Sequence, residues 1–148
     1  MFSDEAEFEL VGLYRIVGKN QIRSVFEYDA GVQTKLEFSR IQIEGNMVKC
    51  RLVERNDRLE AIGFTELDYP SCLLAFKEGR IQRFSAKPDE ESMKKIADAL
   101  QGFLPWLAEK YPSDRAKMYT GEGRFIYSRE NGERVVPLLR EWRLSQGK

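Results

Sequence analysis

The sequence predicts an α+β protein in which a curved antiparallel sheet packs against helices. Three or four consecutive strands between Leu36 and Ala86 carry this prediction, because apolar and polar residues alternate there and turns containing glycine separate the runs. Apolar residues at helical spacing before and after this stretch predict helices on both sides of the strands, which gives the α+β class. The length of 148 residues suits one domain, which we divide into an α+β core at 1–112 and a C-terminal helical extension at 113–148.

The chain before this sheet is predicted to form a short strand, a turn and a helix. We expect the strand at about Glu7–Leu10, a turn at Val11-Gly12 and an extended segment at Tyr14–Val17. Gly18 marks a break, and an amphipathic helix is then expected from Lys19 to about Gln33. Its apolar face consists of Ile22, Val25, Phe26 and Ala30.

The predicted strand Met47–Asn56 has one largely apolar face, which we place inward. Val48, Cys50 and Leu52 form this face, and Glu54 continues it at the end of the strand. Asp57 then caps a short helix that runs through Ala61.

The next predicted strand, Thr65–Phe76, contains Pro70, so it is either an edge strand or a bulged one. After the sheet we expect an acidic helix start and an apolar stripe from Met93 to Leu104, with a kink or a restart of the helix at Pro105. The final helix is expected to start near Val135 or Val136, because Pro137 is tolerated only in a first turn.

Composition excludes several classes of function. Lys+Arg and Asp+Glu balance at 24 each, so nothing draws the chain electrostatically to nucleic acid or anionic lipid. The absence of histidine removes Ser-His-Asp and Cys-His catalysis and the commonest metal ligand. No Cys, Asp or Glu cluster has metal-ligand spacing, and no apolar run spans a membrane. We therefore expect a cytoplasmic protein without cofactor, metal, nucleic-acid or membrane partner.

Three stretches resemble the nuclear transport factor 2-like superfamily, which includes ketosteroid isomerase and the SnoaL-like polyketide cyclases. "FSDEAEFELVG" at 2–12 looks like the acidic run that leads into the first strand of the family. "FKEGRIQRFSA" at 76–86 looks like its last hairpin. The family helix start is matched by Gly18, Ile22, Arg23 and Phe26. The resemblance covers about residues 2–87 and implies a cone-shaped α+β fold and a homodimer through the open sheet face.

Two departures from the family pattern affect what the resemblance implies. The family has helices before its acidic run, whereas Met1 stands directly at that run here. We therefore expect a shortened variant, with the missing wall supplied by a partner chain or by the C-terminal extension. The catalytic aspartates of the ketosteroid isomerases align with Leu10 and Cys72, and leucine cannot abstract a proton.

Two carboxylates are candidates for catalysis. Glu54 continues an inward apolar face, where burial would raise its pKa and make it a base; a solvated position at the sheet rim is the alternative. Asp68 shares strand parity with Cys72, unless a bulge at Pro70 reverses its direction.

Further residues are candidates for ligand contact beside these two carboxylates, and each has a structural alternative. Tyr28, with Asp29 next to it, either reaches the mouth of the cone or, as we favour, stays on the helix surface. Cys50 and Cys72 are either nucleophiles activated without histidine or, as we favour, buried thiols. Arg83 either binds an anionic ligand or pairs with a carboxylate across the sheet.

Three hypotheses of function follow. The first is a domain that binds a small apolar molecule, without catalysis. The second is an isomerase, cyclase or hydratase that uses Glu54 or Asp68 as a base, and a deep pocket holding one of them would favour it. The third is a protein-interaction module, which a cone filled by its own side chains would favour.

Overall fold

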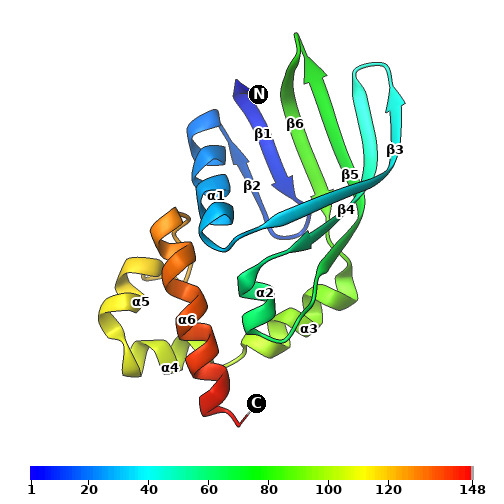
Figure 1. Ribbon diagram of the computed structural model, residues 1–148. Helices are drawn as coiled ribbons and strands as arrows, with labels where there is room; N and C mark the ends of the chain where they lie inside the picture. The colour runs from blue at the N-terminus through cyan, green and yellow to red at the C-terminus, as the bar shows by residue number, and fades with distance from the viewer. Residues whose placement is uncertain (148) are drawn as a thin grey trace.

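The computed structural model describes residues 1–147, which hold six strands and six helices (Figure 1). The strands are β1 (Phe2–Leu10), β2 (Tyr14–Val17), β3 (Lys35–Glu44), β4 (Met47–Arg55), β5 (Leu67–Lys77) and β6 (Arg80–Lys87). The helices are α1 (Lys19–Gly31), α2 (Asp57–Ala61), α3 (Glu90–Leu100), α4 (Phe103–Lys110), α5 (Pro112–Met118) and α6 (Arg129–Ser145).

The strands form one curved sheet in the order β2-β1-β6-β5-β4-β3, which confirms the α+β class. Four of the five pairings are antiparallel, as the sequence predicts. The pairing of β1 with β6 is parallel, which makes the sheet a mixed one. The reason is topological, because the chain runs through four further strands and two helices before β6 returns beside β1, and such a long crossover permits parallel pairing.

Pro70 produces a β-bulge that decides which side chains face the interior. Cys50 pairs with Cys72 and Leu52 pairs with Tyr69, so two residues of β5 stand opposite Arg51 alone. The bulge reverses the alternation along β5. Tyr69 therefore faces inward, opposite Leu52.

Helices cover the inner face of the sheet. Helix α1 packs on β1, β2 and α6, while α2, α4 and α5 also contact α6 (Figure 1). Two glycines allow α1 and α6 to approach closely. A Cβ atom at Gly132 would lie 2.8 Å from the Tyr28 carbonyl oxygen, and one at Gly31 would lie 2.4 Å from the Arg129 carbonyl oxygen.

Several element boundaries differ from the sequence prediction, and β1 begins at Phe2 rather than near Glu7. The helix after the sheet breaks at Gln101-Gly102, where Gly102 has φ of 96°, and restarts as α4 with Pro105 in its first turn, so of the two predicted alternatives the helix restarts rather than kinks. Helix α6 begins at Arg129, because the Ser128 hydroxyl accepts a hydrogen bond from the backbone amide of Asn131 and so caps the helix. Pro137 therefore lies in the interior of α6 rather than in its first turn. Asn56, rather than Asp57, caps α2.

The buried core lies between the inner face of the sheet and the helices. Within residues 1–147, no helix is both long and apolar enough to cross a membrane.

Candidate functional site

A cavity of about 660 Å³ lies between the inner face of the sheet and the helices. Its walls are mainly apolar, with Phe8, Leu52 and Phe84 among the buried lining side chains. Leu36 and Phe38 line it from β3 and are 40% and 41% exposed, so the cavity reaches the surface along this edge strand. A cavity of this size and lining is typical of sites for small organic molecules.

Polar side chains from several elements also line this mainly apolar cavity. Strands β2, β4 and β5 and helices α1 and α2 each contribute, as does the segment between α5 and α6. The polar lining residues are Tyr14, Tyr28, Asp29, Glu54, Asn56, Arg58, Tyr69, Tyr119 and Tyr127.

Glu54 is held inside the cavity by two hydrogen bonds. The Tyr69 hydroxyl donates to Oε1 at 2.8 Å, and the Asn56 amide donates to Oε2 at 2.7 Å. Burial raises the pKa of Glu54, although the hydrogen bond from Tyr69, the charge of Arg58 and the hydrogen bond from Asn56 oppose this shift. Asn56 also accepts a hydrogen bond from the Leu59 amide, so the cap of α2 orients the carboxylate.

Asp29 is a second carboxylate in the cavity. Burial, together with the negative charge of Glu54, raises its pKa to about 7, and a hydrogen bond from the Thr34 hydroxyl at 3.2 Å opposes the shift. Asp29 therefore exchanges a proton near neutral pH, whereas an exposed aspartate is fully ionised there.

Tyrosine hydroxyls surround these carboxylates. The pKa values of Tyr14, Tyr28 and Tyr69 are raised, mainly by burial, and neighbouring negative charges raise them further. These phenols keep their protons at physiological pH and act as hydrogen-bond donors.

Arg58 lies near the start of α2 and lines the same cavity. Burial alone would lower its pKa, but the hydroxyls of Tyr28, Tyr119 and Tyr127 and the charge of Glu54 raise it overall. The guanidinium therefore stays charged inside the protein.

The C-terminal extension forms part of the cavity wall. Tyr119 and Tyr127 line it, and the buried Asn131 fixes this segment to α6. The Asn131 amide donates to the carbonyl oxygens of Lys117 at 3.0 Å and Ile126 at 2.8 Å, and Arg134 donates to its Oδ1. One buried side chain thus positions the residues that close this end of the cavity.

The structure brings together some of the predicted site residues and separates others. Glu54 and Tyr28 line the cavity, with Asp29 beside Tyr28. Asp68 does not, because the bulge at Pro70 turns it to the outer face, where it accepts a hydrogen bond from Arg51 at 2.8 Å.

Arg83 and the two cysteines also lie outside the cavity lining. Arg83 is half-exposed and forms an ion pair with Glu9 at 3.6 Å, which is the alternative weighed from the sequence. Cys50 and Cys72 are free, buried and directly paired across β4 and β5. Burial raises the pKa of Cys72, with Cys50 as a further cause, so this thiol is not an activated nucleophile.

Six polar residues of the site were not predicted from the sequence: Tyr14, Asn56, Arg58, Tyr69, Tyr119 and Tyr127. Tyr69 was missed because a strand without a bulge turns it outward. The sequence did contain an indication of the inward orientation of Tyr69, since a proline inside a strand indicates either an edge strand or a bulge. The motif "NDRLEA" reads as an exposed helical turn, so nothing in the sequence distinguished Arg58 from a surface arginine.

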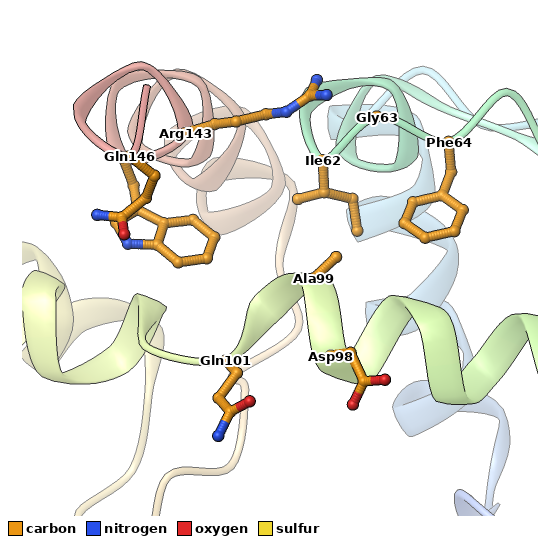
Figure 2. A pocket seen from close by; sticks show the side chains of 9 residues that line it. Ile62, Gly63, Phe64, Asp98, Ala99, Gln101, Arg143 and Gln146 are labelled. Atoms are coloured by element: carbon orange, nitrogen blue, oxygen red, sulfur yellow. The ribbon is translucent and has the colours of Figure 1, made fainter. Parts of the chain in front are cut away.

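A second, smaller pocket of about 300 Å³ lies between α2, α3 and the end of α6. Figure 2 shows Ile62 pointing toward Ala99, with Arg143 reaching from α6 toward Gly63. This pocket contains neither Glu54 nor Asp29.

No protein-family model matches the chain, and the search of curated proteins found no relative. Solved structures are similar in fold. An LEH-like epoxide hydrolase from M. tuberculosis has a TM-score of 0.52 and 20% identity, covering 76% of this chain and 79% of that one. SalBIII, an epoxide hydrolase/cyclase-like enzyme of pyran ring formation in salinomycin, has a TM-score of 0.53 and 17% identity, covering 61% and 74%.

A third similar structure carries the family name. It is a nuclear transport factor 2-like protein of unknown function from Cytophaga hutchinsonii, with a TM-score of 0.50 and 14% identity, covering 63% of this chain and 73% of that one. Identities this low show the fold alone. The curved six-stranded sheet with its helices is thus similar in fold to the nuclear transport factor 2-like proteins.

Proposed function

We propose that this protein binds a largely apolar small molecule in the cavity and moves a proton on it, with Glu54 as the base. The observation that carries the proposal is the half-buried Glu54 carboxylate, which Tyr69 and Asn56 hold in position within a mainly apolar cavity of about 660 Å³. A cone filled by its own side chains would have favoured an interaction module instead.

The two carboxylates of the cavity have different environments, so that one is suited to act as the base and the other as the acid. Glu54 accepts two hydrogen bonds that favour its charged form. The charge of Glu54 in turn favours the protonated form of Asp29, whose pKa is raised to about 7. Glu54 is therefore the base and Asp29 the proton donor.

Two reaction classes fit this pair. In the first, Glu54 removes a proton from carbon next to a carbonyl group, and Asp29 donates a hydrogen bond to the developing enolate oxygen. In the second, Glu54 takes a proton from water, whose oxygen attacks an epoxide carbon. The carbon–oxygen bond of the ring then breaks and Asp29 protonates the released oxygen. Similarity in fold to an epoxide hydrolase and to SalBIII supports testing the second class.

Binding without catalysis is the second candidate function, and the apolar lining favours it. Fluorescence of the uncharged probe N-phenyl-1-naphthylamine tests binding, since its emission rises in apolar surroundings. The wild-type protein should bind the probe saturably, and Met93→Trp should weaken binding, because Met93 lines the cavity and the larger side chain fills it.

Catalysis is tested with 2-tetralone in D₂O and with styrene oxide. Wild-type protein should accelerate either exchange of hydrogen for deuterium next to the carbonyl or opening of the epoxide to the diol. Glu54→Gln should remove at least about 99% of the acceleration, given the usual contribution of a general base. Asp68→Asn, which changes a carboxylate on the outer face, should retain it. Probe binding without any acceleration of either reaction would leave the binding function alone.

A further inference from the structure

Arg58 is the single cationic side chain among the described residues that line the cavity. It is half-buried, and its guanidinium is partly removed from water. A charge in such a place needs hydrogen-bond acceptors, because part of its hydration shell has been removed.

Within residues 1–147, no side chain or carbonyl group accepts a hydrogen bond from Arg58, and no carboxylate forms an ion pair with it. Every side-chain nitrogen or oxygen that is sealed from solvent has a hydrogen-bond partner in this structure. The unpartnered nitrogens of Arg58 are therefore open to solvent, and the residue lines the cavity. Their donors are available to a molecule bound in the cavity.

Glu54 accepts no hydrogen bond from Arg58, although its negative charge helps to raise the pKa of the guanidinium. Both Glu54 oxygens already accept hydrogen bonds, from Tyr69 and from Asn56. The carboxylate is thus directed toward β5 and the cap of α2.

Phenol hydroxyls add further donors around Arg58. Tyr28, Tyr119 and Tyr127 lie close enough to influence its charge, and all three line the cavity. The hydroxyls of Tyr28 and Tyr119 have no hydrogen-bond partner among the described residues and remain accessible, whereas the Tyr127 hydroxyl is hydrogen-bonded to that of Tyr14. One cation with several free donors is a site for anionic oxygen, which a guanidinium and hydroxyls bind by charge-assisted hydrogen bonds.

We infer that the molecule bound in the cavity carries an anionic oxygen group, a carboxylate or an enolate, held by Arg58 and the hydroxyls of Tyr28 and Tyr119. Its apolar body lies against the aromatic wall that Phe8 and Phe84 form, whose rings stack with centroids 4.9 Å apart. This inference rests on the proposed function, because it requires that the cavity binds a small molecule.

A matched pair of fluorescent probes tests the inference. The probe 8-anilinonaphthalene-1-sulfonate carries an anionic group, whereas N-phenyl-1-naphthylamine has the same two ring systems without it. Arg58→Gln should weaken binding of the anionic probe about tenfold or more and change binding of the neutral probe less than about twofold, since a hydrogen bond to a charged group is worth this much. Arg83→Gln and Arg143→Gln, which remove cations outside the cavity, should change neither.

Each outcome separates the inference from the proposed function. If the neutral probe binds and Arg58→Gln leaves the anionic probe unaffected, the anion site is wrong and the cavity remains a binding site. If the wild-type protein binds neither probe, the proposed function and the inference both fail. Should Arg58→Gln not fold, as judged by its circular dichroism, Arg58→Lys replaces it, and the same selective weakening of the anionic probe is required.

Displacement of the anionic probe distinguishes the two sources of anionic oxygen. 4-Phenylbutanoate offers a carboxylate and 1-phenylbutane-1,3-dione offers an enolate. Displacement by the first alone assigns a carboxylate ligand, and displacement by the second alone assigns an enolate. Failure of both to displace the probe overturns the inferred ligand class.

Discussion

The Tyr69 hydroxyl donates a hydrogen bond to Oε1 of Glu54 at 2.8 Å, between neighbouring strands β5 and β4. The contact depends on the bulge at Pro70, because a regular β5 would turn Tyr69 toward the outer face. The irregularity that proline imposes on this strand thus positions the partner of the Glu54 carboxylate.

Tyr69→Phe should raise the pKa of Glu54. The phenol hydrogen bond favours the charged carboxylate, so its removal favours the protonated form. The change is measured by NMR titration of ¹³C-carboxyl-labelled glutamate, with Glu54→Gln used to assign the resonance. Tyr111→Phe, which removes a hydroxyl bound to Glu141 near the surface, serves as the control and should leave the Glu54 titration unchanged. An unchanged pKa in Tyr69→Phe would mean that this hydrogen bond is not made in solution.

Asp29 should make the protein less stable as pH rises through neutrality. Its pKa is raised from 3.8 to about 7, so the folded protein binds this proton more tightly than the unfolded chain. The resulting stability is fully present below the unfolded pKa and is lost as pH rises through about 7. Between pH 5 and pH 8 we expect Asp29 to account for a loss of about 2–3 kcal/mol in the free energy of unfolding.

Urea denaturation at several pH values measures this contribution. Asp29→Asn should lose much less stability than the wild-type protein between pH 5 and pH 8, because asparagine does not titrate. Asp68→Asn should keep the wild-type pH dependence, since Asp68 lies on the outer face beside Arg51. Parallel pH profiles for wild type and Asp29→Asn would show that Asp29 titrates like an exposed aspartate.

Gly132→Ala should destabilise the protein by about 1–3 kcal/mol, because overpacking forces helix α6 away from α1. The added Cβ would lie 2.8 Å from the Tyr28 carbonyl oxygen and 3.3 Å from its Cδ2 atom. Gly121→Ala is the matched control, since a Cβ there meets nothing within 4 Å. Equal denaturation midpoints for the two variants would contradict this close approach.

Asn131→Leu should cost about 2–4 kcal/mol of stability, because it leaves the carbonyl oxygens of Lys117 and Ile126 without their side-chain donor. It should also weaken binding of N-phenyl-1-naphthylamine, since these bonds hold the segment that carries Tyr119 and Tyr127 against the cavity. Denaturation and probe titration test the two effects separately. Unchanged probe binding would show that the wall does not depend on Asn131.

Sequence reasoning recovered the parts of the site that follow from local periodicity. Glu54 lies in the cavity because β4 keeps its alternation as far as its last inward residue. Tyr28 was a candidate for which we favoured the helix surface, and it is instead buried in the cavity lining. Asp68 was placed inward because the phase of β5 depends on a bulge that the sequence permits but does not locate.

The remaining site residues come from contacts that are distant in sequence. Arg58 becomes interior only because α1 and the segment carrying Tyr119 and Tyr127 close over it. The parallel pairing of β1 with β6 likewise depends on the path of the whole chain. Homodimer formation through the sheet face stays a prediction, which sedimentation equilibrium would test.

The most direct test of the account is the ¹³C-carboxyl resonance of Glu54 during titration with N-phenyl-1-naphthylamine. The account predicts a saturable shift of this resonance and a raised Glu54 pKa in the complex, because an apolar ligand displaces water from around the carboxylate. The resonance of Asp68, labelled in the same way, should stay where it is. Saturable probe binding that leaves the Glu54 resonance and its pKa unchanged would place the ligand elsewhere and contradict the proposed site.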